Sequence, residues 1–121
     1  MSYLLLIQEP LGQREARTPE EGRQAYARMT DFADRLRDQG LLQAAQSLQS
    51  LNHGSRVSRR EGRVSTLDGP FAEAKEMVGG FFWLNCQDRE QALAIARECP
   101  AAEWATVEVR ALGPCFAESR G

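Results

Sequence analysis

The stretch Thr66-Leu67-Asp68-Gly69-Pro70-Phe71-Ala72-Glu73-Ala74-Lys75-Glu76 is the most informative part of this chain. Its Asp-Gly-Pro run predicts a tight turn, because Asp caps nearby backbone N–H groups, Gly permits positive φ and Pro fixes its own φ. An aromatic ring and alternating charges follow, ahead of the Gly79-Gly80 pair. The sequence therefore predicts a rigid turn that presents Phe71 and several ionisable groups beside a strand.

Composition indicates one globular domain that is not built to bind nucleic acid or an anionic membrane. The chain has 121 residues, of which 42% are hydrophobic and 26% charged, so one core can form without metal or disulfides. The net charge of −2 gives no overall field that would attract nucleic acid or an anionic membrane. Three cysteines without a close pair predict neither a disulfide framework nor a zinc site, and we expect a cytoplasmic protein.

The apolar pattern around the turn predicts alternating strands and helices. Residues 3–8 are nearly all apolar, which is typical of a strand that is buried on both faces, and the run is too short to span a bilayer. Residues 10–17 are expected to form a loop. Thr18, Pro19 and Glu21 predict a capped helix start, and Gly40 predicts its end. The remaining expected elements are strands at 42–51, 77–86 and 105–111, a hairpin of 55–60 with 63–67, and a helix from Asp88 to Cys99.

This order of elements predicts an α+β, ferredoxin-like split βαβ fold with an antiparallel sheet and a β-hairpin insert. We expect the domain to cover residues 1–113, followed by a tail at 114–121. Two helices can cover only one face of a four-stranded sheet, yet residues 3–7 and 81–84 are apolar on both faces. A second copy of the chain is the simplest partner for the uncovered face, so we expect a homodimer.

The chain resembles the DGPF group of the YCII-related family over nearly its whole length. The most specific resemblance is the Asp-Gly-Pro-Phe block with its following Lys-Glu and Gly-Gly pairs. The other segments that resemble the family are 3–7, 40–49, Gly62-Arg63-Val64 and Val107-Glu108-Val109-Arg110. The resemblance implies a dimeric α/β-barrel assembly. It also implies a link to sigma-factor pathways, because members of this group resemble products encoded beside extracytoplasmic-function sigma factors.

The signature stretch supplies most of the candidate ligand-binding residues, which are Gln49, Asp68, Phe71, Lys75 and Glu76. Gln49 is included because it belongs to the Leu-Gln pair of the family-like second strand. The alternative interpretation is structural: Asp68 closes the turn, Phe71 packs in the core, and Lys75 and Glu76 are solvated or ion-paired. A catalytic role would need a carboxylate whose pKa is shifted by its surroundings.

Other chemically notable residues favour structural roles. His53, the only histidine, lies in a polar turn, and the cysteines are expected to be buried and inert. Better-studied family members are thought to pair a His on the first helix with an Asp near the end of the second. This chain places Met29 and Cys99 near those positions, so we assign no catalytic residue from the resemblance. A group of arginines at 56, 59, 60 and 63 is expected to keep the hairpin from pairing with other chains.

Three functional classes follow from these observations. The first is a small-molecule-binding domain with a regulatory role, whose cleft lies either between the sheet and the first helix or between the facing sheets. The second is a small enzyme, similar to isomerases or lyases, and the third is an interaction partner in sigma-factor-linked transcription. We expect no metal and no cofactor, because no metal-ligand spacing or Gly-rich phosphate loop is present.

Overall fold

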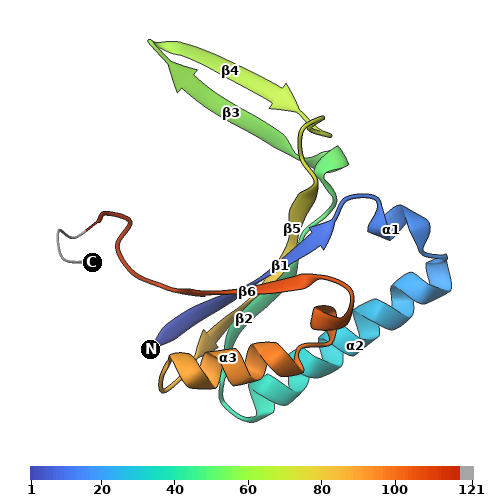
Figure 1. Cartoon of the computed structure of the whole chain (residues 1–121), viewed down its shortest axis with the longest axis vertical. Helices are drawn as coiled ribbons and strands as arrows, with labels where there is room; N and C mark the ends of the chain where they lie inside the picture. The colour runs from blue at the N-terminus through green and yellow to red at the C-terminus, as the bar shows by residue number, and fades with distance from the viewer. Residues whose placement is uncertain (118–121) are drawn as a thin grey trace.

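Four strands form one antiparallel sheet in the computed structural model, which describes residues 1–117 (Figure 1). Their spatial order is β2-β5-β1-β6, and both long helices, α2 (Pro19–Asp38) and α3 (Arg89–Glu98), pack on one face of the sheet. The strands are β1 (Ser2–Pro10), β2 (Leu42–Ser47), β5 (Glu76–Asn85) and β6 (Thr106–Ala111). The predicted α+β, ferredoxin-like fold is therefore confirmed.

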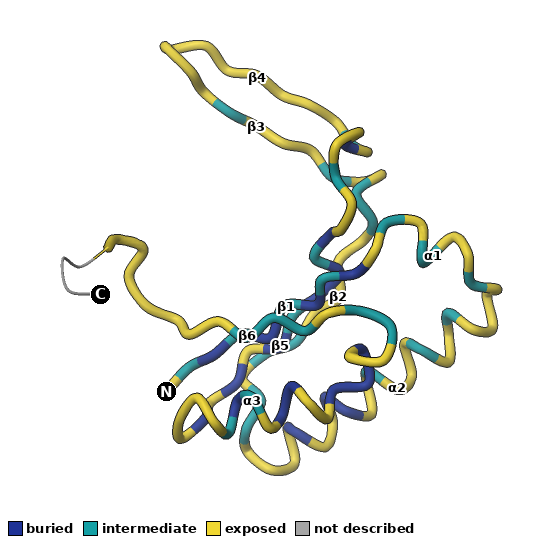
Figure 2. The backbone as a smooth tube through the Cα atoms, in the orientation of Figure 1, coloured by how far each residue is buried: buried dark blue, intermediate teal, exposed yellow. Residues whose placement is uncertain are grey.

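The hairpin insert forms a second, two-stranded sheet of β3 (Ser55–Arg60) and β4 (Arg63–Asp68). It projects away from the helices as a long arm that is exposed along almost its whole length (Figures 1 and 2). Three short helices complete the described chain: α1 (Gln13–Ala16) and the 3₁₀ turns η1 (Leu51–His53) and η2 (Pro100–Glu103). Part of the expected tail, residues 118–121, lies outside the described residues.

The ends of α2 follow the predicted capping chemistry. The Thr18 hydroxyl accepts a hydrogen bond from the Glu21 backbone N–H, and the Glu21 carboxylate accepts one from the Thr18 backbone N–H. These bonds hold the pKa of Glu21 below its usual value. At the other end Gly40 has φ of +74°, which a residue with a side chain rarely adopts. Local sequence thus determines where α2 begins and where it ends.

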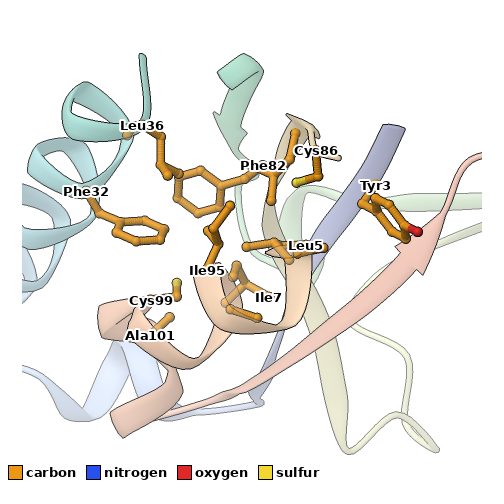
Figure 3. Close-up of a cluster of buried hydrophobic side chains, with 14 residues drawn as sticks. Tyr3, Leu5, Ile7, Phe32, Leu36, Phe82, Cys86, Ile95, Cys99 and Ala101 are labelled. Carbon is orange, nitrogen blue, oxygen red and sulfur yellow. The ribbon is translucent and has the colours of Figure 1, made fainter. Parts of the chain in front are cut away.

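The core lies between the sheet and the two long helices. Tyr3, Leu5 and Ile7 alternate along β1 with half-buried residues, so every second side chain points toward the helices. The rings of Phe32 from α2 and Phe82 from β5 meet edge to face with centroids 5.4 Å apart (Figure 3). This contact packs α2 against the middle of the sheet.

Two sequence predictions were wrong in detail. Residues 10–17, expected to be a loop, contain the short helix α1. The second strand, expected at 42–51, ends at Ser47, and the chain then turns into η1. A register shift in β2 also places Leu42 and Ala45 opposite Leu84 and Phe82, so both face the helices. If inward and outward side chains are counted alternately from Leu42, Ala45 is placed on the wrong face. The bulge inserts one extra residue into the strand and so shifts the alternation.

The sheet face opposite the helices has no cover within residues 1–117. Leu4 and Leu6 of β1 are only half-buried there, and Trp83 of β5, paired with Leu4, keeps 39% of its surface exposed. The strands are thus apolar on both faces, as predicted. An apolar sheet face of this kind is rarely left in water by a stable protein.

The Asp-Gly-Pro-Phe turn joins the base of the hairpin to the domain. Asp68 accepts a hydrogen bond from the Ser55 hydroxyl at 2.7 Å, and the Gly69 N–H donates to the Gly54 carbonyl at 2.8 Å. Phe71 is buried, with the Arg56 guanidinium 3.7 Å from its ring centroid. A Cβ at Gly69 would collide with the Leu51 carbonyl oxygen. The turn therefore requires glycine because two backbone segments approach each other there.

We expect Gly69→Ala to lower the free energy of unfolding by about 2 kcal/mol, because the added methyl must push the turn away from η1. Gly113→Ala is the matched control, since a Cβ there meets no atom within 4 Å, and its effect should stay within about 0.5 kcal/mol. Urea unfolding followed by tryptophan fluorescence measures both. Equal stability of the two variants would contradict the close-approach explanation.

Candidate functional site

A cleft of about 560 Å³ lies between α2 and the sheet face that the helices cover. Its helix wall comes from one side of α2, its floor from β1, β2 and β5, and one end from Trp104, which follows η2. Most of the lining is apolar. Its charged groups come from β1 and the α1 segment (Glu9, Arg14 and Arg17) and from α2 (Asp34 and Arg37), and Gln49 lines it after β2.

A buried ion pair between Glu9 and Arg14 is the main polar feature of the cleft. Only 8% of the Glu9 side chain is exposed, and its Oε1 accepts a hydrogen bond from Arg14 Nε at 2.5 Å. The same guanidinium donates to the carbonyl of Leu48 at 2.8 Å and to that of Gly79 at 3.2 Å. Arg14 thus connects α1 to β1, to β5 and to the segment after β2, and these form one end of the cleft.

Gly79 makes room for this ion pair. It is an extra residue in β5, because Ile7 pairs with Gly80 while the next residue of β1 pairs with Val78. A Cβ at Gly79 would collide with Glu9 Oε2 and would come within 2.8 Å of the Arg14 guanidinium. The first glycine of the Gly-Gly pair is therefore explained by a buried carboxylate on the neighbouring strand.

Trp104 lies at the same end of the cleft, between two arginines, and its carbonyl accepts a hydrogen bond from Gln13 Nε2 of α1 at 2.6 Å. The guanidinium carbons of Arg17 and Arg28 lie 5.4 and 5.3 Å from its ring centroid, within the range of cation–π attraction. Arg28 is also bound by Glu103, and these hydrogen bonds raise the pKa of Arg28 and lower that of Glu103. Arg17 forms no ion pair within 4 Å among residues 1–117. Its charge adds to the Thr18 hydrogen bonds that lower the pKa of Glu21.

The predicted site residues do not come together. Gln49 lines the cleft, whereas Asp68 and Phe71 lie at the base of the hairpin. Lys75 and Glu76 are exposed at the start of β5, and the Lys75 carbonyl accepts a hydrogen bond from the Leu11 N–H at 3.1 Å. Within the described chain, no hydrogen bond links the side chains of Asp68, Lys75, Glu76 and His53.

The cysteines and the histidine supply no reactive pair. Burial raises the pKa of the Cys86 thiol and of the Cys99 thiol, so both are protonated at neutral pH. His53 is exposed in η1.

Met29 lines the cleft, while Cys99 is buried in the core, so neither of the two positions where the resemblance implies a catalytic His or Asp carries an acid or a base here. In residues 1–117 no group of three or more potential ligands could hold a metal ion.

Sequence reasoning missed Glu9 and Arg14, although one signal was available. Glu9 continues the alternation of Tyr3, Leu5 and Ile7, so its side chain must point to the same buried face. A carboxylate at such a position needs a partner, because an unpaired buried charge is strongly destabilising. The partner, Arg14, lay in a segment that was expected to be an irregular loop.

Comparisons with known proteins agree with this fold. The family model described as "YCII-related domain" matches residues 1–115. An uncharacterized protein, R00369, of Rhizobium meliloti (strain 1021) is 42% identical over 53 residues, which are 42% of this chain and 43% of that protein. The match thus spans less than half of that relative's length.

A solved structure also has a similar fold. It is 5-chloro-2-hydroxyhydroquinone dehydrochlorinase (TftG) from Burkholderia phenoliruptrix AC1100, with a TM-score of 0.57 and 13% sequence identity. The similarity covers 93% of this chain and 94% of that one. At this identity the comparison supports the fold alone.

Among residues 1–117, no helix is long and apolar enough to cross a membrane.

We expect Arg14→Met to lower the free energy of unfolding by about 3 kcal/mol, because it leaves the Glu9 carboxylate buried without its counter-charge. Adding Glu9→Leu should restore most of this loss. Arg23→Met is the matched control, since its ion pair with Glu20 is exposed and should contribute less than about 1 kcal/mol. Urea denaturation measures all three. An Arg14→Met effect no larger than that of the control would contradict the buried pair's role.

Proposed function

Because this chain belongs to the YCII-related family, we propose that it is a homodimeric protein that binds a small organic molecule in the cleft between α2 and the sheet. The observation that carries this proposal is the cleft itself. Its volume of about 560 Å³ is typical of small-molecule sites, and its lining combines apolar walls with a few fixed polar groups.

The composition of the walls supports binding of an uncharged or weakly polar molecule. Ala25 and Met29 on α2 and Ala45 on β2 line the cleft, together with the Trp104 ring, and they offer apolar contact without filling it. The Glu9–Arg14 pair supplies polar groups that are held in place by several hydrogen bonds. Fixed polar groups in an apolar cavity orient a ligand at little entropic cost.

The uncovered sheet face supports dimerisation. Leu4, Leu6 and Trp83 form the apolar centre of this face, and a second copy related by a two-fold axis would bury the same patch on both chains. Because the cleft lies on the helix-covered face, the dimer leaves it accessible. The dimer therefore stabilises the sheet that forms the floor of the binding site.

An enzyme that acts on a small cyclic molecule is the second candidate. The structure of the dehydrochlorinase is a complex with 2,5-dihydroxybenzoquinone, so a protein of similar fold binds a small ring. In this chain the Glu9 and Asp34 carboxylates line the cleft, and an isomerase- or lyase-like reaction uses such a group to move a proton on a bound molecule. A link to sigma-factor pathways and a cytoplasmic location stay predictions from the sequence.

Blocking the cleft should abolish binding. We expect a thermal-shift screen of a broad metabolite library to give at least one compound that raises the melting temperature of the wild type, because ligands stabilise the state they bind. Ala25→Trp should remove that shift, since Ala25 lines the cleft. Ala27→Trp is the control, because Ala27 is exposed on α2 and does not line it. Retention of the shift in Ala25→Trp would place the ligand elsewhere.

A charge on the uncovered sheet face should dissociate the dimer. Leu6→Glu places a carboxylate at the centre of the proposed interface, so we expect the wild type to have twice the mass of one chain and the variant to be monomeric. Ala94→Glu, on the exposed side of α3, should remain dimeric. Light scattering after size-exclusion chromatography measures the mass. A monomeric wild type at micromolar concentration would refute the dimer.

A further inference from the structure

We propose that Glu9 Oε2 accepts a hydrogen bond from the ligand, so that the molecule bound in the cleft is a largely apolar compound with a hydroxyl group, such as a phenol or an enol. This inference rests on the proposed small-molecule function and adds the chemical class of the ligand. It assigns a binding role to a residue that lies far in sequence from the Asp-Gly-Pro-Phe signature.

The two oxygens of the Glu9 carboxylate have different surroundings. Oε1 is bound by Arg14, whereas Oε2 accepts no hydrogen bond from any residue in 1–117. Every fully buried side-chain oxygen or nitrogen in residues 1–117 has a hydrogen-bond partner. Because Oε2 has none, it must retain some accessible surface. Glu9 lines the cleft and no other described pocket, and Oε2 lies beside Gly79, another cleft residue. Oε2 is therefore the oxygen of this cleft-lining carboxylate that remains available to a bound molecule.

A carboxylate oxygen in this position has a strong preference for a hydrogen-bond donor. With 92% of the side chain shielded, a ligand that displaces water from Oε2 without offering a hydrogen must leave a charged acceptor unpaired. Hydrogen bonds to ionised acceptors are about twice as strong as those between neutral groups. Oε2 thus discriminates against ligands that place only an acceptor or an apolar group against it.

The surrounding charges select a neutral donor over a cation. Arg14 already balances the Glu9 charge at 2.5 Å, and Arg17 and Arg37 also line the cleft. Asp34 offsets Arg37 at 2.9 Å, and Arg17 forms no ion pair with a carboxylate that lines the cleft. An ammonium ligand would meet this excess positive charge. A hydroxyl group donates to Oε2 without that repulsion, and the apolar lining accommodates the rest of the molecule.

The test compares two rings of similar shape that differ in donor capacity: hydroquinone and its dimethyl ether, 1,4-dimethoxybenzene. Ligand-observed NMR titrations of the full chain would measure both dissociation constants. We expect the wild type to bind hydroquinone at least about tenfold more tightly, as a hydrogen bond to a charged acceptor should provide. Glu9→Gln can keep the contact with Arg14 while it presents an amide NH₂ in place of Oε2. This variant should lose the preference for hydroquinone.

Glu15→Gln is the matched control, because Glu15 is exposed beside Arg14 in α1 and does not line the cleft; it should keep the wild-type preference. Should Glu9→Gln not fold, ¹³C labelling of glutamate carboxyl carbons reports on the wild type directly. Hydroquinone should then shift the Glu9 signal, and the dimethyl ether should not.

The outcomes separate this inference from the proposed function. Equal affinity of the wild type for both rings, or an unchanged preference in Glu9→Gln, would overturn the role of Glu9 while the cleft remains a binding site. Absence of hydroquinone binding at millimolar concentration would also overturn it. The library screen with Ala25→Trp judges the cleft by itself, because it does not depend on which donor the ligand carries.

Discussion

The buried pair of Glu9 and Arg14 is the interaction on which the end of the sheet and the shape of the cleft depend. One guanidinium binds the Glu9 carboxylate and two backbone carbonyls, and so fixes the segment after β2 and the bulge of β5 relative to β1. A side chain at position 79 would displace this carboxylate and the Arg14 guanidinium, which the glycine leaves in place. Desolvation makes the buried Glu9 charge costly without Arg14, so the ion pair stabilises the contact between these segments.

The Asp-Gly-Pro-Phe signature has a separate structural role. Its polar and aromatic side chains bind the first strand of the hairpin, with Asp68 on Ser55 and Phe71 under Arg56, and Gly69 allows the turn to approach η1. The exposed arm is thereby attached to the domain by its base (Figure 2). A signature can thus identify a family through a packing requirement, while the carboxylate that lines the cleft lies on another strand.

The uncovered sheet face and the cleft are two consequences of the same layer arrangement. Two helices shelter one side of the sheet, and the cleft lies on that side, beneath α2. The other side keeps Trp83 exposed. The proposed dimer interface and the proposed ligand cleft therefore lie on opposite faces of the sheet, so a substitution can test one without direct damage to the other.

The sequence alone determined the elements whose causes are local. The capping box at Thr18, the positive φ of Gly40 and the alternation along β1 depend on neighbouring residues, and each was predictable. Even Glu9 could have been placed on the buried face from that alternation. Its pairing with Arg14, the β-bulge at Gly79 and the distance of Asp68 from the cleft were decided only by tertiary structure, because each depends on how segments remote in sequence approach one another.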